Sequence, residues 1–271
     1  MFYVRSTDGV KLAVYDPNPA GSEVVLLIHG WPLSHKIYEY QCELLLARGY
    51  RPISMDLRGF GASDVPLGPY DYDQMAQDIY NVVCALQLSA FTLVGFSMGG
   101  AIVLRYMNRF QGYGVKRLLL LAAAAPSWVE RPGFPHGLSR ETVDSLIEGI
   151  RTNRPQVCQT FTHEQLFASL QSQPMMDWFQ AIALSADGWA TLQTCISLRD
   201  EDGRADLAAV QVPTFILHGA KDVVVSSALA QAQHEGIAGS MLFTLENSGH
   251  AIMVDQLQEF NSCFLQALQA R

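Results

Sequence analysis

The residues best suited to chemistry lie in a Gly-x-Ser-x-Gly segment at positions 95–99, centred on Ser97. An apolar stretch ends at Val94 just before it, and the helix-forming stretch Ala101–Met107 follows it. This order predicts a sharp turn between a strand and a helix, with glycines that leave room for neighbouring backbone. Such a turn would present the hydroxyl of Ser97 at the edge of a sheet as a nucleophile. The alternative is that Ser97 only caps the following helix.

A serine hydroxyl is a weak nucleophile at neutral pH, so it needs a base that removes its proton. His250 suits this role because it follows the last expected strand, and Gly249 would let the chain bend back toward Ser97. His29 and His218 each end a buried strand in a His-Gly pair, so we assign them structural roles. The remaining histidines are expected at the solvated surface: His35, His136, His163 and His234.

The base in turn needs a carboxylate that holds the imidazole in the correct tautomer and stabilises its charged form. Asp222 follows the strand that precedes the last one, so it should reach the same edge of the sheet as His250. Its alternative role is to cap a helix that begins near Ser226. The acidic run Asp200–Asp202 is expected to be a solvated loop.

A tetrahedral intermediate needs two N–H donors directed at its negatively charged oxygen. One should be the backbone N–H of Met98, which follows the nucleophile. The other should come from Trp31, in the loop after an early buried strand. The predicted catalytic set is therefore Ser97, Asp222 and His250, with the N–H groups of Trp31 and Met98 as the oxyanion hole.

Short apolar strands alternate with amphipathic helices along most of the chain. This alternation predicts βαβ crossovers and an α/β fold with a mostly parallel, eight-stranded sheet flanked by helices. Strands are expected at Phe2–Ser6, Leu12–Tyr15, Val24–Ile28, Pro52–Met55, Thr92–Val94, Arg117–Leu121, Thr214–Leu217 and Met241–Leu245. Helices are expected at His35–Arg48, Asp73–Leu86, Met98–Arg109, Ser226–His234 and Gln256–Ala270.

The alternation stops at Pro126 and resumes only at Thr214. We call residues 127–208 the helical insertion, because their sequence predicts short helices separated by proline, glycine and asparagine. They are expected to form a cap inserted after the sixth strand, over a core domain of residues 1–126 and 209–271. Apolar residues there would line a pocket for an uncharged substrate or attach the cap to the core. The predicted pocket residues are Trp128, Phe161, Trp178, Trp189, Val223 and Ala251.

The composition of the 271 residues argues against several classes of function. With 49% hydrophobic and 16% charged residues, the chain should form a compact globular protein. Its net charge of −8 argues against nucleic-acid and anionic-membrane partners. We find no signal peptide and no apolar run long enough to span a membrane. Five scattered cysteines without a Cys-x-x-Cys pair indicate buried free thiols in the cytoplasm and no metal site. No cofactor is expected, and a homo-oligomer is left open.

Together, these motifs resemble the α/β-hydrolase superfamily over essentially the whole chain. Within it, the sequence is most similar to arylesterases and cofactor-free haloperoxidases, in which hydrogen peroxide replaces water on the acyl-enzyme. The resemblance implies hydrolysis of esters with an accompanying perhydrolase activity. It is carried by His29–Leu33, Asp56–Asp64, Gly95–Gly100, His218–Asp222 and Gly249–His250.

We therefore expect a serine hydrolase that cleaves small, largely apolar carboxylic esters or lactones through an acyl-enzyme. Ser97 argues against the dehalogenases and epoxide hydrolases of the superfamily, which use an aspartate nucleophile. Two alternatives stay open at this point. One is a carbon–carbon bond hydrolase of ring-cleavage products, which uses the same three residue types. The other is a ligand-binding or signalling protein with slow turnover.

Overall fold

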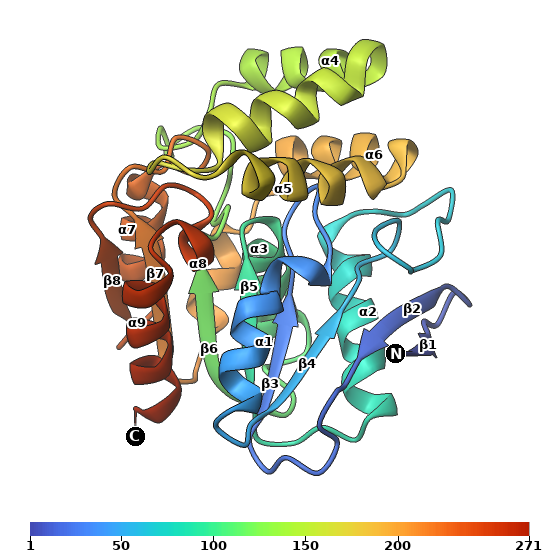
Figure 1. The fold of residues 1–271 in the computed structure, drawn as a ribbon, viewed down its shortest axis with the longest axis vertical. Helices are drawn as coiled ribbons and strands as arrows, with labels where there is room; N and C mark the ends of the chain where they lie inside the picture. The colour runs from blue at the N-terminus through green and yellow to red at the C-terminus, as the bar shows by residue number, and fades with distance from the viewer. Residues whose placement is uncertain (271) are drawn as a thin grey trace.

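The computed structural model describes residues 1–270 and arranges them around one eight-stranded sheet (Figure 1). β1 with β2, and β2 with β4, pair antiparallel, whereas all other neighbouring strands pair in parallel. The order β1-β2-β4-β3-β5-β6-β7-β8 confirms the predicted mostly parallel α/β architecture. The strands are β1 (Phe2–Arg5), β2 (Lys11–Tyr15), β3 (Val24–Ile28), β4 (Arg51–Met55), β5 (Phe91–Phe96), β6 (Val115–Leu121), β7 (Thr214–Gly219) and β8 (Met241–Leu245).

Helices cover both faces of this sheet. One predicted helix, His35–Arg48, is divided in the structure, because a 3₁₀ turn at His35–Tyr38 precedes α1. The predicted helix Gln256–Ala270 corresponds to α9, and non-helical backbone at Gln256 separates α9 from the short α8, which the sequence pattern did not predict. The helices outside the insertion are α1 (Glu39–Leu46), α2 (Tyr72–Ala85), α3 (Met98–Arg109), α7 (Ser227–Gly236), α8 (Ile252–Asp255) and α9 (Leu257–Gln269).

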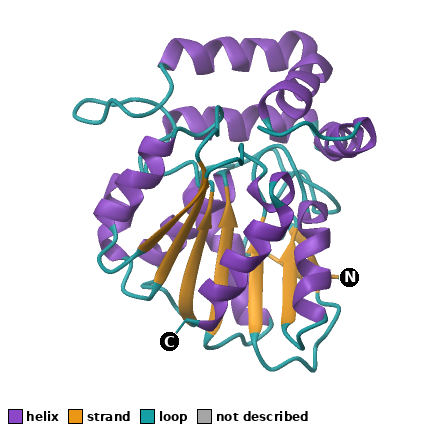
Figure 2. Ribbon diagram, turned by 60° about the vertical axis from the view of Figure 1, so that its left-hand side comes forward, coloured by secondary structure: helices purple, strands orange, loops and turns teal. Residues whose placement is uncertain are grey.

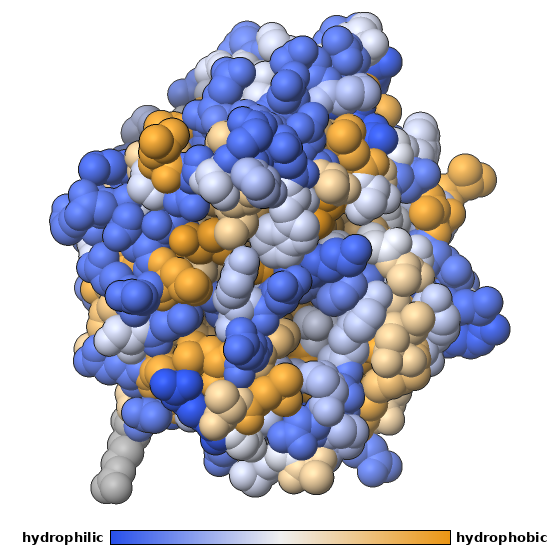
Figure 3. Space-filling view, in the orientation of Figure 1, coloured by the Kyte–Doolittle hydropathy of each residue, from blue (hydrophilic) through white to orange (hydrophobic). Residues whose placement is uncertain are grey.

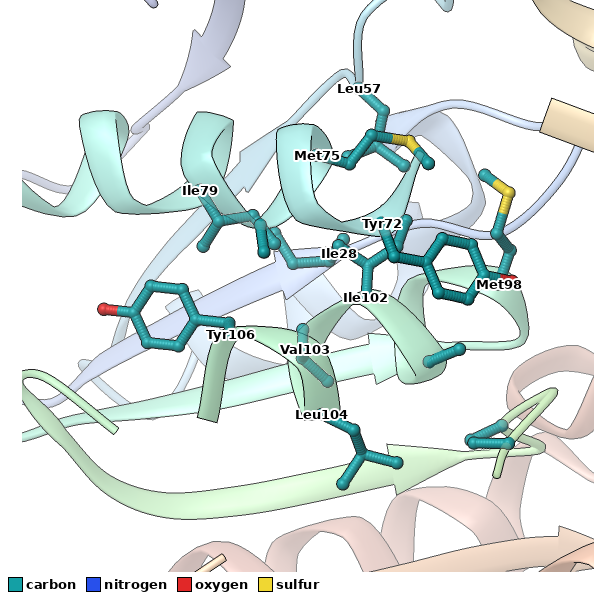
Figure 4. Packing of buried hydrophobic residues seen from close by; sticks show 14 of the residues in the cluster. Ile28, Leu57, Tyr72, Met75, Ile79, Met98, Ile102, Val103, Leu104 and Tyr106 are labelled. Carbon is teal, nitrogen blue, oxygen red and sulfur yellow. The ribbon is translucent and has the colours of Figure 1, made fainter. Parts of the chain in front are cut away.

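The central strands are apolar at nearly every position because both of their faces are buried. In β3, Leu26 and Ile28 belong to the hydrophobic core that holds α2, α3 and α7. Val25 and Leu27 belong to the opposite core, which holds α1 and α9. Figure 4 shows the first core, where side chains of α2 and α3, such as Met75, pack together. Both cores hold the ends of the strands in fixed positions.

The helical insertion lies over the carboxyl ends of the strands (Figures 1 and 2). Its first helix is bent, because Asn153 departs from helical geometry and Pro155 lacks a backbone N–H. Hydrophilic side chains cover most of the surface visible at this end of the molecule (Figure 3). The elements here are α4 (Arg140–Thr160), α5 (Gln173–Ser185) and α6 (Gly188–Asp200), with a π-helical turn at Phe161–Gln165 and a 3₁₀ helix at Arg204–Ala209.

The Asp56–Asp64 motif stabilises the fold through buried hydrogen bonds. Arg58 is fully buried and donates two hydrogen bonds of 2.6 and 2.7 Å to Asp78 on α2. Asp56 is also buried and accepts from the backbone N–H groups of His35 and Ala62. These contacts fix the loop after β4 against its neighbours.

The five cysteines all lie in the described part of the chain and carry free thiols. Cys158 and Cys195 are buried as expected, but Cys84 lies exposed on α2, so the expectation of burial is wrong there. In residues 1–270, no helix has the length and apolar character needed to cross a membrane.

Candidate active site

Ser97 lies at the junction of β5 and α3 in a strained backbone conformation, with φ 53° and ψ −120°. L-residues rarely adopt positive φ, so surrounding contacts must hold it there. The Ser97 N–H donates to the carbonyl of Leu121 (2.9 Å), and the Ser97 carbonyl accepts from the N–H of Ala124 (3.0 Å). The chain leaving β6 therefore holds the turn from both sides.

The two glycines of the motif are required by close backbone contacts. A Cβ on Gly95 would lie 2.6 Å from the carbonyl oxygen of Gly99 and from a methyl group of Val103 on α3. A Cβ on Gly99 would lie 2.4 Å from the carbonyl oxygen of His29, after β3. Any larger residue would force apart the strands and helix that shape the turn, as the motif predicts.

The structure brings Ser97, Asp222 and His250 together. The Oγ of Ser97 lies 2.9 Å from Nε2 of His250, and Nδ1 of His250 lies 2.8 Å from Oδ2 of Asp222. A carboxylate only accepts hydrogen bonds, so Nδ1 carries the proton and the lone pair of Nε2 faces the serine hydroxyl. All three side chains are buried, and Ser97 is 6% exposed. This arrangement can move a proton from the serine oxygen to the imidazole.

Asp222 stays ionised in this buried position. Burial alone would raise its pKa, but the facing imidazole of His250 and several hydrogen bonds lower the pKa below its usual range. Among those bonds, Oδ1 accepts from the N–H groups of Val224 and Val225, both at 2.8 Å. The alternative of a helix cap does not apply, because Ser226 caps α7.

His29 and His218 hold loops in place, as predicted. Burial lowers the pKa of His29 to about 4, so its ring is neutral. Its Nδ1–H donates to the carbonyl of Gly30 and its Nε2 accepts from the N–H of Leu57. Burial also lowers the pKa of His218, whose Nε2–H donates to the carbonyl of Val225.

The predicted oxyanion-hole donors are free to bind a ligand. Within residues 1–270, the backbone N–H groups of Trp31 and Met98 have no hydrogen-bond acceptor. Met98 opens α3, where the first N–H groups of a helix lack partners. The ring of Trp31 is held in place by a hydrogen bond from Nε1 to the carbonyl of Thr191 on α6 (2.9 Å).

A cavity of about 550 Å³ opens above Ser97, between the edge of the sheet and the helical insertion. Every described residue that lines it is uncharged, and most are apolar. Three of the predicted pocket residues do line it: Trp128, Phe161 and Val223. The cavity has the size of a typical small-molecule site.

The prediction is wrong for three other pocket residues. Trp178 packs against Tyr40 and Phe179. Trp189 is 45% exposed, and its Nε1–H donates to the carbonyl of Leu67. Ala251 is buried in the loop of His250. No residue of α5, the helix of Trp178, lines the cavity, and Leu198 is the residue of α6 that does. Aromatic character alone does not reveal which helices face the cavity.

Sequence reasoning missed the part of the lining that α4 supplies. Leu146 lies before the bend at Asn153 and Val157 after it, so the bent helix follows the wall of the cavity. Apolar residues spaced three or four positions apart in this segment are the signal that would have pointed to an inward face. Among the described residues, His, Cys, Asp and Glu side chains form no cluster that could hold a metal ion.

Comparison with known proteins agrees with this geometry. The model of the alpha/beta hydrolase family matches residues 25–262. The AB hydrolase superfamily protein YisY of Bacillus subtilis is 42% identical, with 97% of each chain covered. An esterase from Exiguobacterium antarcticum is 39% identical with a TM-score of 0.97, and a bromoperoxidase from Bacillus anthracis is 30% identical with a TM-score of 0.93. Each match to these two structures covers 99% of both chains. The chain therefore belongs to the alpha/beta hydrolase family, and esterases and haloperoxidases are among its relatives.

Proposed function

We propose that this enzyme hydrolyses small, uncharged carboxylic esters or lactones through an acyl-enzyme formed on Ser97. The observation that carries the proposal is the hydrogen-bonded series from Ser97 through His250 to Asp222, below a cavity lined by uncharged residues. The esterase relative supports the same reaction class.

In the first half of the reaction, the Oγ of Ser97 attacks the carbonyl carbon while Nε2 of His250 takes the hydroxyl proton. Asp222 stabilises the imidazolium that forms. The N–H groups of Trp31 and Met98 donate to the new oxyanion. The intermediate then collapses, the bond to the alcohol oxygen breaks, and His250 returns the proton to that oxygen.

In the second half, a water molecule attacks the acyl-enzyme and gives one proton to His250. Breakdown of the second intermediate releases the carboxylic acid and restores the hydroxyl of Ser97. With a lactone, the alcohol stays attached to the acyl chain, so the product is a hydroxy acid. We further propose that residues 127–208 act as a cap that excludes bulk water during both halves.

The lining of the cavity favours uncharged substrates. Moving a charged group from water into such a site without a partner costs several kcal/mol. Neutral esters with aliphatic or aromatic groups should therefore be better substrates than esters that carry a free carboxylate.

The proposal is tested with a panel of 4-nitrophenyl esters and lactones of graded acyl length, together with covalent labelling by an organophosphonate. Ser97→Ala should lower kcat by roughly 10⁴-fold or more and abolish the labelling. Ser22→Ala, which changes an exposed serine outside the cavity lining, is the control and should keep both. Equal rates in the wild type and Ser97→Ala would exclude catalysis at this site. Preferential turnover of a ring-cleavage diketone would favour carbon–carbon bond hydrolysis instead.

Perhydrolysis is a second candidate activity, favoured by the similarity to the bromoperoxidase. Hydrogen peroxide would attack the acyl-enzyme in place of water and release a peracid, with the same proton transfers through His250. The test is peracid formation from acetate and peroxide, compared between the wild type and Ser97→Ala. Absence of peracid would exclude this activity and leave the esterase proposal intact.

A further inference from the structure

The carboxylate of Asp255, the last residue of α8, accepts several hydrogen bonds from other parts of the chain. Its side chain is buried, and the residue is 6% exposed. Its Oδ2 accepts from the N–H of Gly249 (2.6 Å) and from the N–H of Ala168 (2.8 Å). Its Oδ1 accepts from the N–H and hydroxyl of Ser169 and from the side-chain amide of Gln171.

These partners come from two segments distant in sequence. One is the loop that carries His250, and the other is residues 166–171 of the helical insertion, which we call the insertion turn. The two segments also contact each other directly. The N–H of Ala251 donates to the carbonyl of Leu166 (2.8 Å), and a Cβ on Gly249 would lie 2.7 Å from the backbone nitrogen of Ala168.

His250 is thus held on both sides. The residue before it donates to Asp255, and the residue after it donates to the insertion turn. Its imidazole must keep two hydrogen bonds at once, one to Ser97 and one to Asp222, so a small rotation of this loop would lengthen at least one of them.

We propose that Asp255 is a positioning residue for His250, and that through it the helical insertion sets the geometry of the base. The inference rests on the proposed function, since it assigns His250 the role of base. The carboxylate suits the task because it is acceptor-only and faces only donors. An amide in its place would direct an NH₂ group at one set of backbone N–H donors.

The test compares Asp255→Asn with Asp206→Asn. Asp206 is a matched control because it is also a buried carboxylate, 3% exposed, that ties the end of the helical insertion to Arg105 and Asn108 on α3. Asp255→Asn should lower kcat about 10- to 100-fold with KM nearly unchanged, because a misplaced base slows the chemical step. Asp206→Asn should lower the melting temperature without the selective loss of kcat that is expected for Asp255→Asn.

Two further measurements do not depend on the choice of ester. The rate of organophosphonate labelling of Ser97 should fall in Asp255→Asn by a factor similar to that for kcat. The far-downfield proton resonance of the hydrogen bond between His250 and Asp222 should weaken or disappear in Asp255→Asn and persist in Asp206→Asn. If no ester is turned over by the wild type, the proposed function fails, whereas these two readouts still test the positioning role.

Asp255→Glu keeps the charge and serves if Asp255→Asn does not fold. Its longer side chain displaces the carboxylate, so kcat should fall at least about fivefold, with the labelling rate reduced in parallel. Wild-type kcat and labelling in a folded Asp255 variant would overturn the proposal. A loss of melting temperature alone would do the same.

Discussion

The indole N–H of Trp128 donates a hydrogen bond of 2.9 Å to the carbonyl oxygen of Val224, two residues after Asp222. Trp128 and Val224 line the main cavity, and both also line a second pocket of about 180 Å³ that includes His136 and Ser226. Trp128 therefore forms part of the wall between the two spaces, and its hydrogen bond joins the helical insertion to the loop of Asp222.

Replacing this ring should widen the range of substrates. In Trp128→Ala the two spaces should merge, so the ratio of kcat/KM for a bulky ester to that for a short ester should rise by about tenfold. Trp128→Phe keeps most of the ring and should leave the ratio within about twofold of the wild type. Steady-state kinetics with two matched esters measures it, and the ratio corrects for any loss of folded protein. An unchanged ratio in Trp128→Ala would show that this wall does not limit substrate size.

Asp222→Asn should impair catalysis through the tautomer of His250. The amide oxygen would stay with the N–H groups of Val224 and Val225, so the NH₂ group would face Nδ1 of the imidazole. Nε2 would then carry the proton and would no longer accept one from Ser97. Because the wrong tautomer removes the base, we expect kcat to fall roughly 10⁴-fold at neutral pH. Retention of more than a tenth of the wild-type kcat would contradict this role.

The buried neutral imidazole of His29 predicts a loss of stability in mild acid. In the folded protein its pKa is about 4, whereas in the unfolded chain it is near 6.5. Between these values the unfolded state binds more protons, so the free energy of unfolding falls as the pH falls. His218 contributes in the same direction. From pH 7 to pH 5, His29 alone should cost on the order of 2 kcal/mol.

Urea unfolding at both pH values measures this loss. His29→Gln keeps an acceptor for the N–H of Leu57 and does not titrate in this range. Its free energy of unfolding should therefore fall by about 2 kcal/mol less than that of the wild type between pH 7 and pH 5. Equal pH dependence in the two proteins would mean that other groups account for the loss.

The buried pair of Arg58 and Asp78 predicts an asymmetric mutational response. Arg58→Met leaves the carboxylate of Asp78 buried without its partner and should destabilise the protein by about 3–5 kcal/mol. The double variant with Asp78→Leu removes both charges and should recover most of that loss. Urea unfolding of the three proteins provides the comparison. A double variant as unstable as Arg58→Met would contradict this account.

The positions of Ser97, Asp222 and His250 could be predicted because each follows a recognisable strand or precedes a recognisable helix. The parallel strands bring their carboxyl ends to one edge, so residues 153 positions apart meet there. For the helix Met98–Arg109 and the strand Met241–Leu245, the bounds expected from the sequence are those of the structure. In the helix, local apolar pattern and tertiary burial agree. The strand is mostly apolar although only Leu245 in it is fully buried, so its bounds follow from the residue types alone.

The lining of the cavity could be predicted only in part. Apolar periodicity shows that a helix has a buried face but not which neighbour covers it, so Trp128 and Trp178 look equivalent in the sequence. Asp255 gives no signal at all, because its partners in the insertion turn lie 84 to 87 positions earlier. A single aspartate in a helical segment has the same sequence pattern whether water or a distant backbone surrounds it.

The insertion leaves the sheet after β6 and returns at the neighbouring strand β7, so replacing it would leave the strand order unchanged. However, its Leu166 carbonyl accepts from the N–H of Ala251, and its Ala168 N–H donates to Asp255, the carboxylate that also accepts from the N–H of Gly249. A different insertion without hydrogen-bond donors at this turn would supply a new substrate chamber but leave the imidazole of His250 misaligned. A change in the insertion therefore alters the substrate chamber and the turnover rate together.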